Sequence, residues 1–285
     1  MALLDLILNL SALLLWLNWS YLTLSRREPA APGISLAGTL KTTVAPHIPR
    51  WPYLAGLLAL LLVRALVYFT IGSNLRTNMT LSLGLVSIAF NPRLVMRMFL
   101  FSGLSFAVFT GVFYYGLLLF SVINRQVTQP DTCLRLVRLH LGRVHRWPVW
   151  LQILIPGLAT ALFWMLLAPL LEWLGLFPVH ASGFAYWLRA LLIGVYAYLS
   201  WIPPLVILLV LYGLSSYVYF GDSAFWNFVQ VSGGNLVGRL RLHSRRIDWA
   251  PVVLVPVLLW IGWTGRWGWF HGGASLLIEL WNSLR

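Results

Sequence analysis

Six long apolar runs divide this sequence and restrict what it can fold into. They cover residues 3–24, 53–72, 94–123, 148–174, 187–220 and 249–264. Crossing the hydrocarbon core of a bilayer takes about 20 residues of helix, and the last of the six runs is the shortest. The chain is 60% hydrophobic and 9% charged, against about 45–50% and about 25% in soluble domains. We therefore expect an all-α fold, a polytopic transmembrane helical bundle of about six spans with interfacial amphipathic helices.

The fifth run is too long for one straight transmembrane helix. As a single helix, residues 187–220 would extend about 51 Å, against about 30 Å of hydrocarbon. Pro203 and Pro204 stand near its middle, and each lacks the backbone N–H that a helix interior needs. We expect the helix to kink at these prolines.

A weaker apolar segment at residues 81–90 is too short to cross the bilayer as a helix. It ends at Asn91 and Pro92, directly before the third run. We interpret it as an interfacial or re-entrant piece, with a seventh crossing as the alternative.

The distribution of basic residues predicts the orientation in the membrane. No basic residue precedes the first run, and Asp5 stands inside its start, so we expect an uncleaved span with the N-terminus outside. Six spans then place the three basic loops on the cytoplasmic side, as the positive-inside rule requires. These loops cover residues 25–50, 124–146 and 221–248. The basic residues that do not fit, on the predicted outer side, are Arg76, Arg93 and Arg97.

The second half of the chain contains a tandem repeat. Each copy has a long span, a basic segment and a span that begins at proline, Pro148 in one copy and Pro251 in the other. The basic segments align as Val-Arg-Leu-His-Leu-Gly-Arg-Val (137–144) and Leu-Arg-Leu-His-Ser-Arg-Arg-Ile (240–247). Both copies enter the membrane in the same direction. The predicted divisions are a two-span extension (1–91), two repeats (92–182 and 183–265) and a C-terminal amphipathic helix (266–285).

The basic segment of the first copy has the spacing of an amphipathic helix. Its apolar face consists of Leu134, Val137, Leu141 and Val144, which recur every three or four residues. Its arginines fall on roughly the opposite face and are Arg135, Arg138, Arg143 and Arg146. Residues 128–131, Thr-Gln-Pro-Asp, supply a helix start. We expect this helix to lie in the membrane interface, with its apolar side among acyl chains and its arginines among anionic head groups.

The basic segment of the second copy begins with aromatic residues and is expected to break at Gly233 and Gly234. Its basic end consists of Arg239, Arg241, Arg245 and Arg246. His140 and His243 occupy equivalent positions in the two copies and are candidates for a head-group contact. Three roles stay open for these side chains: setting the topology, binding anionic membrane lipids at about 1 kcal/mol each, and docking a protein partner.

One charged residue, Arg64, lies well inside the second run. A charge at that depth costs a few kcal/mol on insertion scales unless it is paired or hydrated, so Arg64 is a functional candidate. Asp5 in the first run and Glu172 late in the fourth are the partners that we expect. The alternative is a structural polar tie between helices.

Motifs for metal, cofactor or nucleophilic chemistry are missing from the sequence. The six histidines show no His-x-x-x-His spacing, the single cysteine is Cys133, and there is no phosphate loop or nucleophile elbow. Seven acidic residues leave little capacity for general acid–base catalysis. We expect a non-enzymatic protein without a cofactor. Because the net charge of +13 is spread over loops, no nucleic-acid partner is expected.

Three short motifs in the second repeat occur in one order. Residues 216–226 (Ser-Tyr-Val-Tyr-Phe-Gly-Asp-Ser-Ala-Phe-Trp) end a span, residues 236–241 (Leu-Val-Gly-Arg-Leu-Arg) are basic, and residues 248–252 (Asp-Trp-Ala-Pro-Val) begin the next span. This order resembles the YggT (YlmG) family of bacterial and plastid membrane proteins over roughly residues 94–262. Asp248 and Pro251 match the family's Asp-x-Ser-Pro element, with alanine at the serine position, and the first copy keeps only Pro148.

The resemblance implies a small integral scaffold or assembly factor of the bacterial inner membrane. Members of the family have been associated with envelope and division processes, nucleoid distribution, osmotic or ionic stress, and cytochrome assembly in plastids. The expected partners are anionic lipids and a protein of a membrane complex. The alternative is a small transporter or channel in ion or osmotic homeostasis that uses Arg64 and the kinked fifth span.

Overall fold

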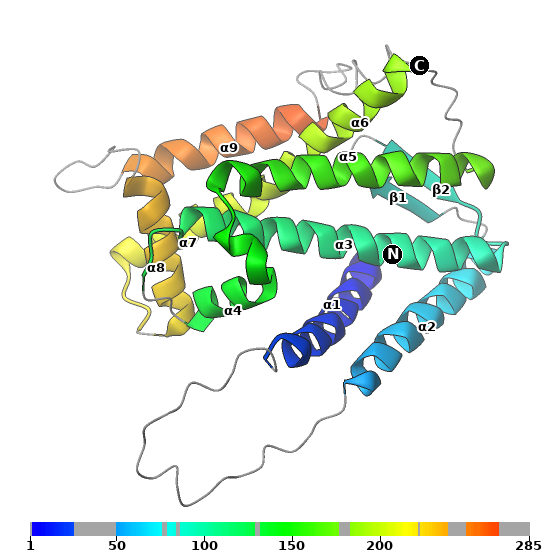
Figure 1. The fold of residues 1–285 in the computed structure, drawn as a ribbon, viewed down its shortest axis with the longest axis horizontal. Helices are drawn as coiled ribbons and strands as arrows, with labels where there is room; N and C mark the ends of the chain where they lie inside the picture. The colour runs from blue at the N-terminus through cyan, green and yellow to red at the C-terminus, as the bar shows by residue number, and fades with distance from the viewer. Residues whose placement is uncertain are drawn as a thin grey trace, which may run out of the picture. The chain divides into compact units, whose positions relative to one another are not determined.

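α-Helices make up most of the chain in the computed structural model (Figure 1). The structure describes residues 2–25, 50–75, 79–83, 86–128, 132–176, 183–221, 223–238 and 249–267. The contacts group the chain into two compact units. Unit 1 consists of Met1–Met79 and Asn91–Thr110, and unit 2 of Thr80–Phe90 and Gly111–Arg285. Helix α3 (Val95–Ile123) contributes its first half to unit 1 and its second half to unit 2.

Unit 1 contains two antiparallel helices, α1 (Ala2–Ser25) and α2 (Trp51–Leu75), and the first half of α3. Leu15 lies beside Gly56 while Asp5 pairs with Arg64, so the two helices run in opposite directions. Gly72 allows the chain to approach itself closely, since a Cβ there would lie 2.2 Å from the Cβ of Pro92.

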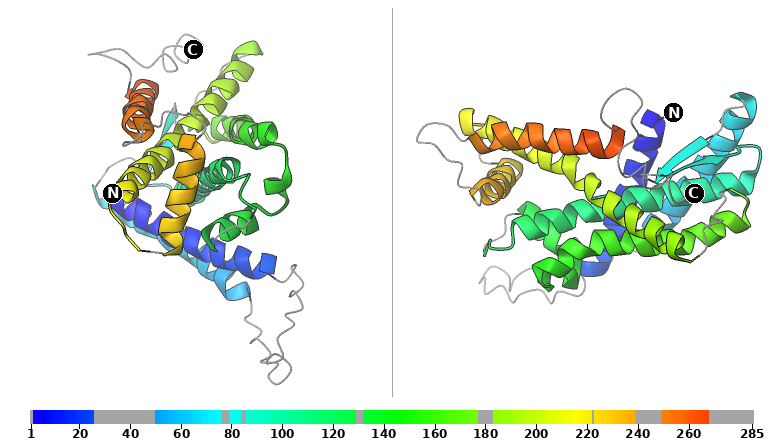
Figure 2. Two further views of the ribbon diagram at one scale, coloured as in Figure 1. Left: turned by 90° about the vertical axis from the view of Figure 1, so that its left-hand side faces the viewer. Right: turned by 90° about the horizontal axis from the view of Figure 1, so that it is seen from above.

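Unit 2 holds the remaining helices and the second half of α3. Its helical elements are α4 (Thr132–Leu141), η1 (Gly142–Arg146), α5 (Val149–Trp173), α6 (Phe184–Ala197), η2 (Tyr198–Trp201), α7 (Ile202–Tyr217), α8 (Ala224–Val237) and α9 (Trp249–Trp267). Helix α5 packs on α6, and α7 packs on both α8 and α9 (Figure 2). The α5 and α6 backbones touch at two glycines, because a Cβ on Gly194 would lie 2.6 Å from the carbonyl oxygen of Gly157.

The predicted all-α, polytopic architecture is confirmed. Five helices of the described chain are long and apolar enough to cross a membrane. They are Leu3–Tyr21, Trp51–Gly72, Val95–Ile123, Val149–Trp173 and Phe184–Tyr217. In α9 the apolar stretch is Pro251–Gly262, which is shorter than these five, so the sixth crossing stays a prediction.

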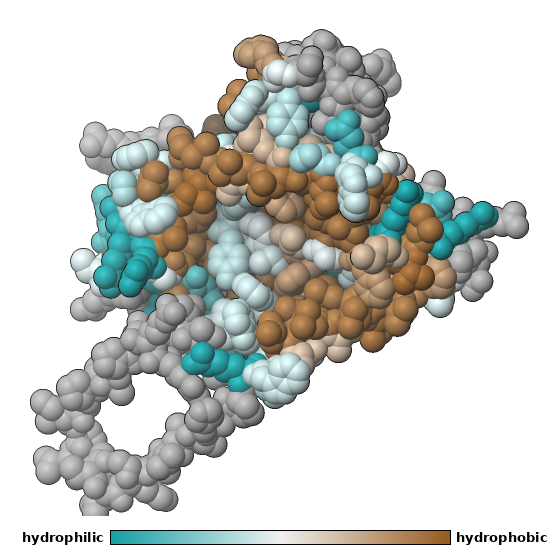
Figure 3. Space-filling model, turned by 45° about the vertical axis from the view of Figure 1, so that its right-hand side comes forward, coloured by the Kyte–Doolittle hydropathy of each residue, from teal (hydrophilic) through white to brown (hydrophobic). Residues whose placement is uncertain are grey.

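The outside of these helices is apolar, as a bilayer requires (Figure 3). On α5, a row of leucines at four-residue spacing is 42–76% exposed: Leu154, Leu158, Leu162, Leu166 and Leu170. Four-residue spacing lines these side chains up along one helix face. A soluble protein rarely exposes so much contiguous apolar surface. The chain is therefore an integral membrane protein.

The fifth span is interrupted close to the predicted position. Helix α6 ends at Ala197, the 3₁₀ turn η2 follows, and α7 begins at Ile202. Pro203 and Pro204 occupy the first turn of α7. Backbone N–H groups in the first turn have no intrahelical acceptor, so the two prolines cost the helix no hydrogen bond. The break therefore precedes the prolines.

The segment at residues 81–90 is a β-hairpin, so a seventh helical crossing is wrong. It forms strands β1 (Met79–Leu83) and β2 (Val86–Phe90), which pair in a two-stranded sheet. The buried side chains alternate with exposed ones and are Met79, Leu81, Val86, Ile88 and Phe90. This period of two is present in the sequence and is the pattern of a half-buried strand.

Two further expectations about helix ends are wrong. Helix α4 stops at Leu141, because Gly142 adopts φ +54°, and the 3₁₀ turn η1 carries the chain past Val144. Helix α8 runs straight through Gly233 and Gly234. Gly233 serves close packing instead, since a Cβ there would lie 2.4 Å from Cγ of Tyr212 in α7.

Candidate functional site

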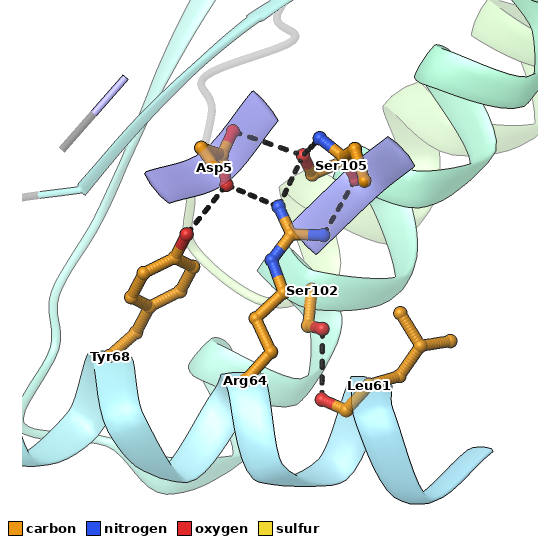
Figure 4. Close-up of polar contacts among 7 residues, drawn as sticks. Asp5, Leu61, Arg64, Tyr68, Ser102 and Ser105 are labelled. Atoms are coloured by element: carbon orange, nitrogen blue, oxygen red, sulfur yellow. Dashed lines mark hydrogen bonds and ion pairs between the residues drawn. The ribbon is translucent and has the colours of Figure 1, made fainter. Parts of the chain in front are cut away.

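Arg64 is the centre of a buried polar cluster in unit 1 (Figure 4). Helix α2 presents Arg64 and Tyr68 one turn apart on the same face. Helix α1 presents Asp5 and Asn9 one turn apart, and Ser105 comes from α3. Four-residue spacing puts Asp5 and Asn9 on one face of α1 and Arg64 and Tyr68 on one face of α2, and these faces meet Ser105 where the helices pack.

The guanidinium of Arg64 is bound on two sides. Its Nη1 donates to Asn9 Oδ1 at 2.7 Å, and its Nη2 donates to Ser105 Oγ at 2.7 Å and forms an ion pair with Asp5. Tyr68 donates its hydroxyl to the same Asp5 carboxylate at 2.8 Å. Asn9 also donates to Ser105 at 3.1 Å.

Aromatic rings complete the surroundings of this charge. The Arg64 guanidinium carbon lies 5.5 Å from the ring centre of Tyr68 and 5.9 Å from that of Phe101. Both distances are within the range of cation–π attraction. Nearby, Ser102 of α3 donates to the Leu61 carbonyl at 2.9 Å and adds a second tie between α3 and α2.

The arrangement in unit 1 can neutralise a charge and hold three helices together. The predicted pairing of Arg64 with Asp5 is confirmed. The other predicted partner, Glu172, is exposed near the end of α5 in unit 2. Because the Arg64 side chain is fully buried and Asp5 is 31% exposed, only the acidic end of the pair is open to the surroundings.

The basic segment lies in unit 2, and its apolar face is covered by protein. Leu134, Val137 and Leu141 are at most 8% exposed. Val137 and Leu141 pack in a cluster with Leu118 of α3, against Ile155 of α5. The prediction that this face lies among acyl chains is therefore wrong: the second half of α3 and the start of α5 satisfy it instead.

The arginines of the segment separate into two groups. Arg138 points back into the protein, where its Nη2 donates to the carbonyl oxygen of Val127 at 2.6 Å. Arg135, Arg143 and Arg146 are exposed. His140 is half-buried, and desolvation lowers its pKa below the usual 6.5, which favours the neutral ring. Three of the predicted arginines thus lie on the surface, and one is used to fix the loop.

Polar side chains that sequence reasoning missed hold the segment in place. Gln152 of α5 is 1% exposed and donates to the carbonyls of Val144, His145 and Trp147 at 3.1, 2.8 and 3.0 Å. Arg125 donates to the Trp147 carbonyl as well, at 2.9 Å. Gln152 stands out in the sequence as a lone amide in an apolar run, and that signal was available.

A second missed cluster joins the end of α3 to α8. Asn124 is 2% exposed and donates to Ser232 Oγ at 2.8 Å, while Asn235 donates to Asn124 Oδ1 at 3.0 Å. These residues are more than 100 positions apart in the chain, so no local pattern pairs them. Arg189 of α6 was also missed: it is a second arginine buried in a span, at 5% exposure.

Several predicted residues lie outside the described part of the chain. They are Arg239, Arg241, His243, Arg245, Arg246, Asp248 and the predicted helix from residue 268 onward. Pro251 is described and buried in the first turn of α9, where it lies beside Gly213 of α7. Among the described residues, no three His, Cys, Asp or Glu side chains meet in a group that could hold a metal.

Comparison of the chain with protein-family models, with curated proteins and with solved structures finds no match. The resemblance to the YggT family therefore stays a prediction from the sequence motifs.

Proposed function

We propose that this integral membrane protein is a non-enzymatic scaffold or assembly factor of the YggT type, which engages anionic lipids or a protein partner through its basic segment. The observation that carries the proposal is the exposure of Arg135, Arg143 and Arg146 on a segment whose apolar face is already packed. The charged side chains of this segment can therefore bind an anionic partner, whereas its apolar face is already buried.

The fixed position of the segment supports a binding role. Gln152, Arg125 and Arg138 each donate to a backbone carbonyl in or next to it. A surface that is ordered before it binds loses less conformational entropy on binding. Arginines that served only to set the topology would need no such support.

Aromatic side chains support a position at the membrane surface. Trp147 and Trp150 are 42% and 65% exposed beside the basic segment, and Trp173 is 82% exposed at the other end of α5. Trp150 and Trp173 are about 34 Å apart along the helix, slightly more than the hydrocarbon core of about 30 Å, so the two indoles would stand at its two edges. By the positive-inside rule, the Trp147 end faces the cytoplasm. The resemblance to the YggT family implies that the membrane is the inner membrane of a bacterium.

The alternative function, a small transporter or channel, would use Arg64. In unit 1 that side chain is fully buried and donates hydrogen bonds to Asn9, Asp5 and Ser105. Transport would require these bonds to open, whereas a structural tie requires them to stay. The cluster therefore favours the scaffold over the transporter.

The test is a pull-down from native membranes with mass spectrometry of the co-purifying lipids and proteins. A variant with Arg135→Gln, Arg143→Gln and Arg146→Gln should lose anionic lipid or a partner that the natural chain retains. Arg93→Gln, an exposed arginine ahead of α3, is the control and should retain both. Equal recovery from the triple variant would contradict the proposal.

A further inference from the structure

Three arginines from separate parts of unit 2 meet at the start of α5. Arg125 follows the end of α3 and donates to the carbonyl oxygen of Trp147 at 2.9 Å, which brings its guanidinium beside the junction of η1 and α5. Arg143 and Arg146 belong to η1, directly before that junction. All three side chains are exposed.

The 3₁₀ conformation of η1 sets the spacing of two of these arginines. Residues three apart in a 3₁₀ helix lie over one another, with a rise of about 2 Å per residue. Arg143 and Arg146 therefore project on the same side, about 6 Å apart along the axis. In an α-helical continuation of α4 the two side chains would differ in direction by about 60°, so the 3₁₀ turn after Gly142 aligns them more closely.

No carboxylate of the described chain neutralises this group. The ion pair between Asp5 and Arg64 is the one such pair among the described residues, and it lies in unit 1. The charges of Arg125, Arg143 and Arg146 therefore repel one another across a small area. The N-terminus of the 25-residue helix α5 adds a partial positive charge at the same place. An anion with more than one charge would relieve this repulsion.

Two tryptophans show which kind of anion fits. Trp147 and Trp150, 42% and 65% exposed, stand next to the arginines at the end of a membrane span. Exposed indole rings at such a place lie among lipid head groups, with the apolar part toward the acyl chains. A lipid phosphate is available at this depth, and it takes two hydrogen bonds from an arginine fork.

We propose that Arg125, Arg143 and Arg146, with Trp147 and Trp150, form a binding site for an anionic phospholipid whose head group carries two phosphates. One phosphate pairs with Arg143 and Arg146, and the other with Arg125. The proposal rests on the proposed function, because it names the ligand of the same basic segment. Arg125 had not been singled out as a binding residue from the sequence.

The test titrates the purified full chain in detergent with single lipids and counts bound lipids by native mass spectrometry. The probes are cardiolipin with two phosphates, phosphatidylglycerol with one, and zwitterionic phosphatidylcholine. Cardiolipin should bind most tightly. The double variant Arg143→Gln/Arg146→Gln should bind cardiolipin about 30-fold more weakly, because each basic side chain contributes about 1 kcal/mol. Arg93→Gln, an exposed arginine ahead of α3 and outside the basic segment, is the control and should change the affinity less than twofold.

Two outcomes overturn the site. In one, Arg93→Gln weakens binding as much as the double variant, which would mean general attraction to basic charge. In the other, the natural chain binds phosphatidylglycerol as tightly as cardiolipin, or inorganic pyrophosphate displaces cardiolipin at equal concentration. In both cases a protein partner retained in the native-membrane pull-down would leave the scaffold function standing. The variant Arg143→Lys/Arg146→Lys keeps the charge and should lose the preference for two phosphates, which guards against misfolding of the glutamine variant.

Discussion

Burial decides what each arginine of this protein can do. Arg64 is 1% exposed and is neutralised by α1, whereas Arg143 and Arg146 are exposed and keep their charge for a partner. Arg138 stands between these cases, with its guanidinium turned back to the carbonyl of Val127. The residue type alone predicts none of this, because the distinction depends on which helix packs over the side chain.

Removing Asp5 alone should cost more stability than removing both Asp5 and Arg64. Asp5→Ala leaves the Arg64 charge buried without a counter-ion. Breaking a fully buried pair costs about 3–5 kcal/mol, and because Asp5 is 31% exposed we expect about 2 kcal/mol. The double variant Asp5→Ala/Arg64→Met should recover part of the loss. Melting temperatures in detergent measure both, and equal losses in the single and double variants would refute the interpretation.

The lowered pKa of His140 predicts a pH dependence. Well above pH 6.5 the ring is neutral in the folded and the unfolded chain, so the shift has no effect on stability. Below pH 6.5 the unfolded chain takes up the proton first, and the stability should fall until the pH passes the lower pKa of the folded state. Melting temperatures from pH 8 to pH 5 measure this trend. His140→Gln should make the trend shallower, and an unchanged slope would assign the effect to other groups.

Close helix contacts in unit 2 depend on glycines at particular positions. The α7–α8 contact needs Gly233 against Tyr212, and the α5–α6 contact needs Gly194 against Gly157. Association of helices inside a membrane relies on such packing, since lipid is as apolar as the helices themselves. The sequence shows Gly233 and Gly234 as an equivalent pair, yet only the first faces a neighbour.

Gly233 and Gly234 should therefore respond differently to substitution. Gly233→Ala places a Cβ 2.4 Å from Tyr212 Cγ, and overpacking of this kind costs about 1–3 kcal/mol. Gly234→Ala meets no atom within 4 Å and should be neutral or stabilise α8 by about 0.5–1 kcal/mol. Hydrogen exchange in α8 compares the two directly. Equal protection in both variants would mean that α8 does not need this contact.

At the scale of the whole molecule, hydropathy predicts the spans but not most of the polar contacts that hold the helices together. The five long helices follow from apolar runs, which are local and additive along the chain. The partners of Asn124 on α8 lie more than 100 residues away, so their contact exists only once α3 and α8 are packed. The hairpin of β1 and β2 has a local signal, the alternation of buried and exposed side chains, which the short length of the segment does not reveal.

The number of crossings predicts the side on which the chain ends. With the N-terminus outside, six crossings place residue 285 outside, and five place it in the cytoplasm. We expect six, so a reporter fused after residue 285 should be active on the outer side.

Cysteines introduced by Arg135→Cys and Glu172→Cys in a Cys133→Ser background should be labelled from opposite sides, because α5 lies between them. Labelling of both from one side would refute the assignment of α5 as a span.

The polar cluster of unit 1 has a consequence for how the chain is made. Synthesis proceeds from the N-terminus, so Asp5 and Asn9 reach the membrane 59 and 55 residues before Arg64, and Ser105 follows 41 residues after it. When α2 enters the membrane, α1 has already been synthesised, so Asp5 can pair with Arg64 from the start. The order of synthesis therefore supplies the counter-ion before Arg64 itself enters the lipid.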